Sequence, residues 1–239
     1  MGQLLVLEQP GKVGYEDYEE RPLESNEVRI KTLFTGISAG TELTSYRGTS
    51  PFFNKKWDPG KRIFEKQTES SWSYPLKQWG YEEVGEVVEI GSSVKQVQLG
   101  DIIFGTWGHK STHIAEEAFA ADRKLLEDLD PVCGIFSHIG AIGINAILDA
   151  NIHVSETVAV FGQGVPGQIV TQLAKLNGAK VIAVDLDDTR LAVAKKFGAD
   201  LVLNSQKCDA SGEIKEITKG LGADVAIEIS GSPVALHEA

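Results

Sequence analysis

The sequence predicts two different folds in one chain: an irregular, mostly antiparallel β-barrel, followed by an α/β domain built on a parallel, doubly wound sheet. Three observations lead to this prediction. Residues 1–130 contain short alternating or apolar runs that are separated by turn residues. From residue 131 onward, apolar runs and helical segments alternate strictly. The length of 239 residues leaves room for two hydrophobic cores.

The first predicted domain, residues 1–130, is defined by β-type runs. Gly11, Pro22 and the pair Gly100–Asp101 supply the residues that tight connections between strands require. The predicted strands are 4–7, 28–34, 84–90 and 102–104. Their short length and irregular spacing favour a small barrel over a flat sheet.

The second predicted domain, residues 131–239, is defined by its alternation. Strands that are buried on both faces have continuous apolar sequences, and helices between them imply a parallel sheet. The predicted strands are 157–161, 180–185, 200–203 and 223–229. The predicted helices are 134–150, 166–177, 187–197 and 211–219, with a further helix beginning at Pro233.

Charge and composition exclude several function classes. A formal net charge of -11 leaves no basic excess to neutralise phosphates, so nucleic acid is not an expected partner. The N-terminus lacks a signal-peptide pattern and no apolar run approaches membrane-spanning length, so we expect a cytoplasmic protein without membrane contact. Only Cys133 and Cys208 are present, which excludes a disulfide framework and a structural zinc lobe.

A glycine motif marks the start of the second sheet. Gly162, Gly164 and Gly167 follow the apolar run 157–161 and open a predicted helix. This context predicts a dinucleotide site, in which the glycines allow a tight turn, close approach of a pyrophosphate and close helix packing. Val165 and Pro166 lie in the same turn, where the helix N-terminus attracts the pyrophosphate.

Asp185 predicts which dinucleotide binds. It ends the second strand, where a carboxylate accepts hydrogen bonds from the ribose hydroxyls and repels a 2′-phosphate. The cofactor expected is therefore NAD(H) rather than NADP(H). Arg190 is also expected among the cofactor-binding residues, but it does not overturn the preference for NAD(H).

The α/β pattern stops after its fourth strand. A full dinucleotide-binding sheet continues further, and an uncovered apolar edge strand is a feature that folded proteins avoid. The sequence therefore predicts a fragment truncated at its C-terminus, or a sheet that another chain completes. Whether the full-length chain forms a homo-oligomer stays open.

Several motifs together resemble the medium-chain dehydrogenase/reductase family, typified by zinc alcohol and sorbitol dehydrogenases. They include GIS at 36–38, GYEEVGEVV at 80–88, GSSV at 91–94, LGD at 99–101, VFGQGVPG at 160–167, GA at 178–179 and GAD at 198–200. The resemblance implies a GroES-like catalytic domain followed by a Rossmann domain. It also implies that Ser230 and Gly231, after the fourth strand, lie beside the nicotinamide ribose.

The departures from this family concern its zinc site. Members with a catalytic zinc carry Cys where this chain has Ser38 and His where it has Tyr81. The third ligand position falls at His138, and His138 with Glu82 is too small a ligand set for a catalytic zinc. We therefore expect no metal. The segments around Ser38 and Tyr81 resemble the non-zinc branch that includes bacteriochlorophyllide a dehydrogenase.

Without zinc, other groups must hold the substrate oxygen and move its proton. Tyr81 and His138 are the natural candidates, with Ser38 or Thr41 as a relay and Glu82 orienting them. The alternative is an inactivated metal site, whose replacements only satisfy one another's hydrogen bonds.

A basic and aromatic stretch, 47–79, follows the Ser38 segment. It is interpreted either as a lid that accepts an anionic or ring-bearing small-molecule substrate or as a solvated loop anchored by its aromatic residues. The leading functional hypothesis is an NAD(H)-dependent oxidoreductase acting on a secondary alcohol or its ketone. The alternatives are a zinc-free quinone or enoyl reductase and a catalytically decayed nucleotide-binding sensor or scaffold.

Overall fold

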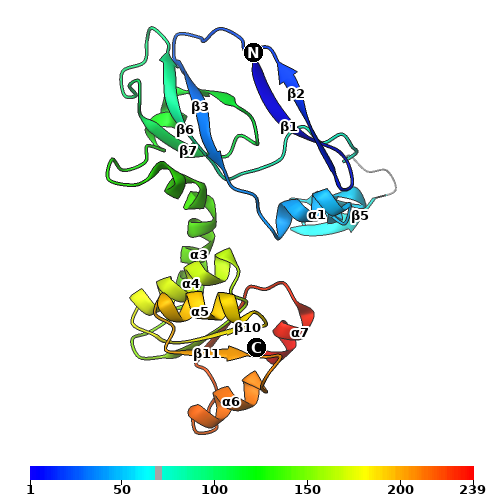
Figure 1. Ribbon diagram of the computed structural model, residues 1–239, viewed down its shortest axis with the longest axis vertical. Helices are drawn as coiled ribbons and strands as arrows, with labels where there is room; N and C mark the ends of the chain where they lie inside the picture. Colours follow the sequence, from blue (N-terminus) through cyan, green and yellow to red (C-terminus); the bar gives the residue numbers. More distant parts are fainter. Residues whose placement is uncertain (68–71) are drawn as a thin grey trace. The chain divides into compact units, whose positions relative to one another are not determined.

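The computed structural model describes residues 1–67 and 72–239 and divides the chain into two units, Met1–His138 and Ile139–Ala239 (Figure 1). The strands of the first unit are β1 (Gly2–Gln9), β2 (Lys12–Tyr18), β3 (Glu27–Thr35), β4 (Lys55–Asp58), β5 (Ile63–Lys66), β6 (Glu83–Ile90), β7 (Ile102–Gly105) and β8 (Thr112–Glu116). Its helices are α1 (Thr41–Arg47), α2 (Glu117–Ala121) and the short 3-10 helices η1 (Pro51–Phe53) and η2 (Pro131–Phe136).

The first unit is built on an antiparallel sheet with the strand order β7-β6-β3-β8. The inward side chains of its strands form one core that includes Val28, Ile30, Val87 and Ile103. β1 pairs with β2 in a separate two-stranded sheet. Its Leu5 N–H also donates to the carbonyl of His109, in the loop between β7 and β8, at 2.8 Å. The four predicted strands are present. β2 and β8 were not predicted, because their half-exposed, polar sequences lack an apolar run.

The second unit contains a parallel sheet with the order β11-β10-β9-β12. Its strands are β9 (Thr157–Phe161), β10 (Lys180–Asp185), β11 (Leu201–Asn204) and β12 (Val225–Glu228). Its helices are α4 (Val165–Leu176), α5 (Asp188–Lys196), α6 (Ala210–Ile217) and α7 (Pro233–Glu238), preceded by α3 (Ser137–Ala150). This is the order of the first four strands of a doubly wound dinucleotide-binding sheet.

Both faces of the second sheet are covered, which explains its apolar strand sequences. In β9, Val158 and Val160 pack with the α4 side, where Val170 and Ala174 are fully buried. Ala159 and Phe161 point to the other face and join a cluster that includes residues of α6. The alternation of side chains along one strand therefore supplies two cores.

The boundary between the units lies after His138, whereas the sequence pattern placed it after residue 130. The segment η2 packs against β3, β6 and β7 of the first unit. Gly134 makes this approach close, because a Cβ there would lie 2.6 Å from Cγ2 of Val84. The apolar segment that was predicted as one helix over 134–150 is thus a 3-10 turn on the barrel followed by α3.

The basic and aromatic stretch forms a small lobe after α1. β4 and β5 pair as a hairpin in which Trp57 lies opposite Phe64. Phe53 stacks on Tyr74 at a centroid distance of 5.0 Å, and Phe52 stacks on Trp72 at 4.9 Å. These ring contacts agree with a loop anchored by its aromatic residues. Residues 68–71 of the predicted stretch lie outside the described residues.

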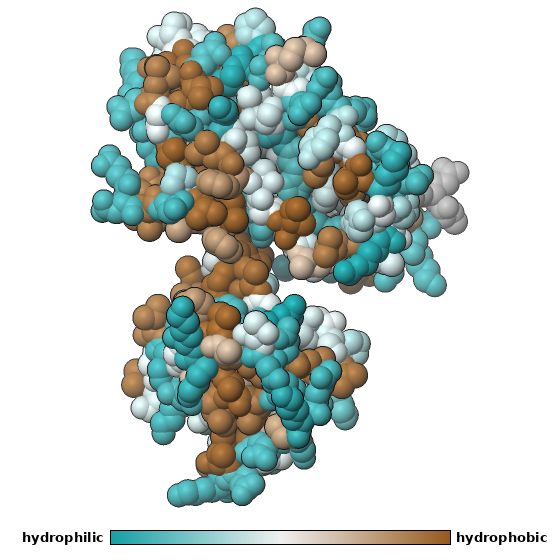
Figure 2. Space-filling model, viewed as in Figure 1, coloured by the Kyte–Doolittle hydropathy of each residue, from teal (hydrophilic) through white to brown (hydrophobic). Residues whose placement is uncertain are grey.

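The helical segment Pro131–Ala150 has the length and mean hydropathy, 1.6, of a helix that could cross a membrane. The sequence pattern did not indicate this, because glycine and polar residues interrupt its apolar run. Figure 2 shows hydrophobic surface along α3. Ile144 and Leu148 of this helix are 49% and 68% exposed. Length and composition alone are weak evidence, since core helices of water-soluble proteins meet the same criterion.

Candidate cofactor and active sites

The glycine motif forms the turn from β9 to α4. Gly162 has a φ of +97°, and a Cβ there would lie 2.7 Å from the Cβ of Ser230. A Cβ on Gly167 would lie 1.8 Å from the carbonyl oxygen of Gly162. The turn therefore needs glycine at both positions. Gly162 is needed for its positive φ and for space beside Ser230, and Gly167 is needed for the close contact with the Gly162 carbonyl.

The N-terminus of α4 differs from those of the helices that follow it. Its N-cap, Gly164, offers no side chain, and Pro166 in its first turn has no N–H. By contrast, side chains of Asp187, Asp209 and Ser232 cap α5, α6 and α7. No side-chain cap hydrogen bond is made at this end of α4, where Val165 is the first helical residue, and an uncapped helix N-terminus suits an anion.

Asp185 organises this turn as well as ending β10. Its Oδ2 accepts from Gln163 N–H at 2.5 Å, and its Oδ1 accepts from the N–H groups of Leu186 and Asp187 at 2.8 and 2.9 Å. A carboxylate offers about four acceptor positions, so about one remains for a ribose hydroxyl. The structural use of Asp185 was not foreseen, because the sequence does not reveal that Gln163 lies beside it.

A cavity of about 470 Å³ opens at this end of the sheet. Four of the predicted cofactor residues line it: Gly162, Asp185, Arg190 and Ser230. Side chains of α7 line it too, and these were not predicted. Gly164, Val165, Pro166, Gly167 and Gly231 are not among its lining residues. The predicted set therefore comes from the β9–α4 turn, the end of β10, α5 and the segment after β12, and only part of it forms the cavity wall.

The segment after β12 is held by Glu228. Its Oε1 accepts from Ser230 N–H at 2.7 Å and from the Ser230 hydroxyl at 2.5 Å. Gly231 follows with a φ of +72°, a conformation that favours glycine. Glu228 was missed by sequence reasoning, although its position at the end of a strand is the signal that identified Asp185.

In the first unit, the Ser38 segment forms a hydrogen-bonded turn at the start of α1. Ser38 Oγ accepts from Thr41 N–H at 3.3 Å, and Glu42 Oε1 accepts from Ser38 N–H at 3.0 Å. The arrangement is similar to a capping box, but the serine hydroxyl satisfies the amide of Thr41 rather than that of Glu42. Both hydroxyls of the predicted relay, those of Ser38 and Thr41, therefore lie in one ordered turn.

Tyr81 and His138 lie next to each other. Their rings meet edge to face at a centroid distance of 5.1 Å and an interplanar angle of 68°. Glu82 lies beside Gly36, where a Cβ would be 2.5 Å from its Oε2. Gly36 N–H also donates to the Glu82 carbonyl at 2.7 Å, which joins the Tyr81 segment to the Ser38 segment.

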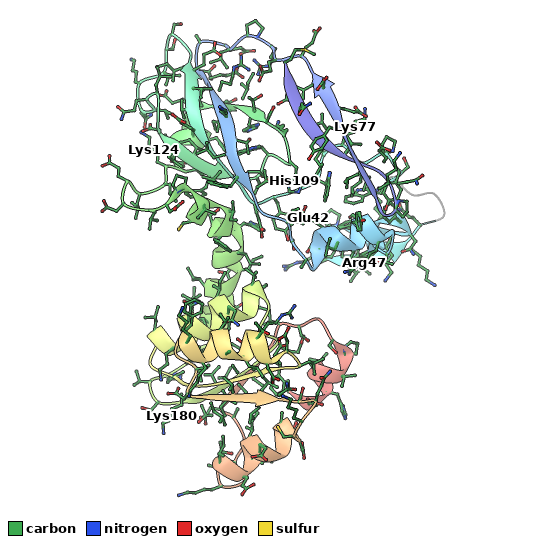
Figure 3. All side chains as sticks on the ribbon, in the orientation of Figure 1. Glu42, Arg47, Lys77, His109, Lys124 and Lys180 are labelled. Atoms are coloured by element: carbon green, nitrogen blue, oxygen red, sulfur yellow. The ribbon has the colours of Figure 1, made fainter. Side chains whose placement is uncertain are left out.

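Two buried acids, Glu42 and Glu83, and the histidine His109 lie near the Ser38 and Tyr81 segments and were not predicted as site residues. His109 Nε2 and Glu42 Oε2 are 2.6 Å apart, and both side chains are 4% exposed (Figure 3). Glu83 is fully buried, and its Oε2 accepts from Trp107 N–H at 2.6 Å. Burial raises the pKa of Glu83. Burial, together with Glu42 and Glu83, raises the pKa of Glu82.

Comparison with known proteins identifies the family. A profile described as zinc-binding dehydrogenase matches residues 166–239. The sequence is 32% identical over 240 residues to D-guloside 3-dehydrogenase of Shigella flexneri. This match covers 98% of this chain and 69% of the relative. The chain belongs to the medium-chain dehydrogenase/reductase family.

Two further members of this family illustrate the likeness. (R,R)-butanediol dehydrogenase of Bacillus subtilis strain 168 is 31% identical over 250 residues, covering 94% of this chain and 69% of that protein. A solved structure of an Escherichia coli oxidoreductase/dehydrogenase of unknown specificity, described as involved in membrane biogenesis, superposes with a TM-score of 0.80. It is 25% identical and covers 100% of this chain and 73% of that one.

The predicted family and the predicted GroES-like plus Rossmann fold are thereby confirmed. The chain is an alcohol dehydrogenase-like oxidoreductase of a nicotinamide-dependent family, whose members act on small molecules. The residues predicted to bind the cofactor lie in the second unit, and Ser38, Tyr81 and His138, predicted at the family's zinc-ligand positions, lie in the first.

The family name implies zinc, but the donor set does not fit it. A tetrahedral catalytic site needs three protein ligands of nitrogen, sulfur or carboxylate type. At the corresponding positions this chain offers a hydroxyl on Ser38, a phenol on Tyr81 and one imidazole on His138. Within residues 1–67 and 72–239, no three His, Cys, Asp or Glu side chains gather with metal-binding geometry.

Proposed function

We propose that this medium-chain dehydrogenase/reductase is an NAD(H)-dependent dehydrogenase that oxidises a secondary alcohol to its ketone without a catalytic zinc. The observation that carries the proposal is the carboxylate of Asp185 in the wall of the cavity beside Gly162. A carboxylate there favours the ribose hydroxyls of NAD over the 2′-phosphate of NADP. Two relatives support a secondary alcohol as the substrate class. Their names, D-guloside 3-dehydrogenase and (R,R)-butanediol dehydrogenase, denote substrates with hydroxyl groups.

The cofactor would be held by the β9–α4 turn. The amides at the uncapped α4 terminus would bind its pyrophosphate, Asp185 its adenosine ribose, and the Ser230–Gly231 turn its nicotinamide ribose. Held in this way, NAD would supply the hydride acceptor for oxidation of the alcohol. Arg190 lines the same cavity, but it lies 4.0 Å from Asp187, whose carboxylate is a nearby counter-charge.

The hydroxyl proton would be handled by the first unit. Tyr81 would donate a hydrogen bond to the substrate oxygen, and the adjacent imidazole of His138 would accept the proton. Ser38 and Thr41 would provide the hydroxyl relay. The raised pKa of Glu82 makes this carboxyl a stronger base than a free glutamate, which suits a group that orients a proton donor.

Kinetics with a panel of secondary alcohols tests this function. We expect turnover with NAD on vicinal diols, polyols or glycosides, and no stoichiometric zinc by elemental analysis. Tyr81→Phe and His138→Ala should each lower kcat by about 100-fold, because general acid–base groups contribute about that much or more. The NADH dissociation constant should not change. NADH binding without any turnover would instead support the sensor alternative, and one zinc per chain would contradict the zinc-free mechanism.

The cofactor preference has its own test. Asp185→Asn keeps one oxygen for the backbone amides but removes the charge, so we expect NADH to bind about tenfold more weakly and NADPH to bind more tightly than before. Asp128→Asn, an exposed loop carboxylate, serves as the matched control. An unchanged ratio of NADH to NADPH affinity, measured by fluorescence titration, would contradict the role of Asp185.

A further inference from the structure

His109 contacts the two segments that carry the proposed substrate-handling groups. On one side its Nε2 lies 2.6 Å from Glu42 Oε2, and Glu42 Oε1 accepts from the amide of Ser38 at 3.0 Å. Figure 3 shows Glu42 and His109 together, reaching from α1 and from the loop between β7 and β8. One carboxylate thus links the imidazole to the backbone of Ser38.

On its other side, His109 contacts the segment that leads to Tyr81. The backbone N–H of His109 donates to the carbonyl of Trp79 at 3.1 Å. The His109 ring itself meets the Trp79 ring at a centroid distance of 4.7 Å. Gly80 has a φ of +99°, and a Cβ there would lie 2.8 Å from His109 Nε2. The residue before Tyr81 is therefore closely packed against the same imidazole.

These contacts are well shielded from solvent. The side chains of His109 and Glu42 are each 4% exposed, so their hydrogen bond does not exchange readily with water. The backbone of His109 is held independently, because its carbonyl accepts from Leu5 N–H in β1. The backbone of His109 is thus anchored to β1, and its side chain contacts the Ser38 turn through Glu42.

We propose that His109 is a positioning residue, which sets the geometry of Ser38 through Glu42 and that of Tyr81 through Trp79 and Gly80. This inference rests on the proposed function, since it concerns the same substrate-handling groups. The expected consequence is kinetic. A displacement of a catalytic group by about 1 Å reduces the rate by about 100-fold, even when the mutated residue does not contact the reacting atoms.

A set of variants separates positioning from simple structural support. His109→Leu removes the partner of a buried carboxylate, which destabilises the fold. The double variant Glu42→Gln/His109→Leu avoids this buried charge and is therefore the principal test. His109→Gln restores an N–H group that can reach Glu42. His153→Leu, which alters an exposed histidine paired with Glu156, is the matched control.

Four quantities are measured on each variant of the whole chain. They are kcat with the best substrate of the secondary-alcohol panel, the NADH dissociation constant, the melting temperature and the hydrogen-exchange rate of the Ser38 amide. For the double variant we expect kcat to fall by about 100-fold and Ser38 exchange to accelerate by about tenfold, with an unchanged NADH dissociation constant. His109→Gln should recover most of both losses. His153→Leu should match the wild type.

Retention of wild-type kcat and Ser38 exchange by the folded double variant would overturn the proposal. So would a fall in kcat that merely follows the fraction of unfolded protein. If the wild type shows no turnover at all, the proposed function fails, but the exchange measurement still decides the positioning role. Unchanged Ser38 protection in that case overturns it, and faster exchange that His109→Gln reverses supports it.

Discussion

His113 lies in the first unit with its ring stacked on Trp107, at a centroid distance of 5.2 Å and an interplanar angle of 9°. Burial, with Lys110 nearby, lowers the pKa of His113 from 6.5 to about 4. Between these two pH values the unfolded chain binds a proton that the folded chain does not. Folding stability is therefore lost as the pH falls below about 6.5, and this group carries no such penalty well above that pH.

Replacing His113 by Phe keeps a ring against Trp107 and removes the titration. Between pH 7 and pH 5.5, we expect the wild type to lose about 1 kcal/mol more of its free energy of unfolding than the variant does. Urea unfolding at the two pH values measures this difference. His153→Phe, which makes the same replacement at an exposed histidine, is the matched control. Equal losses in His113→Phe and wild type would contradict the buried neutral state.

Among the secondary-structure elements, α4 makes a close contact with the turn that precedes it, and glycine is the reason. Gly167 allows the first turn of α4 to meet the carbonyl of Gly162, the residue that follows β9. Gly140 in α3 is the opposite case, because a Cβ there would meet no heavy atom within 4 Å. Two helical glycines of this chain therefore have different physical roles.

The pair Gly167→Ala and Gly140→Ala tests this difference. Gly167→Ala should displace α4, lower stability by about 1–3 kcal/mol and weaken NADH binding by at least about tenfold. Gly140→Ala should raise stability by up to about 1 kcal/mol, because alanine is the better helix former, and should leave NADH binding unchanged. Denaturant unfolding and fluorescence titration measure both effects. Tight NADH binding by Gly167→Ala would contradict the proposed contact.

In the whole molecule, each unit has its own hydrophobic clusters. A ligand that binds only the folded second unit stabilises that unit by about 2.7 kcal/mol at a free concentration of about 100 times its dissociation constant. We therefore expect calorimetry to show two thermal transitions, of which NADH raises one. Gly167→Ala should lower that same transition, whereas Ile30→Ala, in the barrel core, should lower the other. One transition that responds to all three changes would contradict separate folding of the units.

The sequence by itself determined the fold class and most of the second unit. Its strands were predicted within two residues because they are buried on both faces, so their apolar runs need no knowledge of the partner strand. The glycine motif and Asp185 were predicted for a related reason: the turn that joins a strand to the following helix is local in the sequence. The substitutions at Ser38 and Tyr81 were also visible in the sequence.

Only the tertiary structure decided which distant residues meet. Glu42 and His109 are 67 positions apart, and nothing in either local sequence indicates that they form a buried pair. The same holds for Asp185 with the Gln163 amide and for η2, which packs on the barrel although its apolar sequence resembles the start of a helix. Such contacts depend on the chain's path through space, because a polar group is buried only where folding brings it a partner.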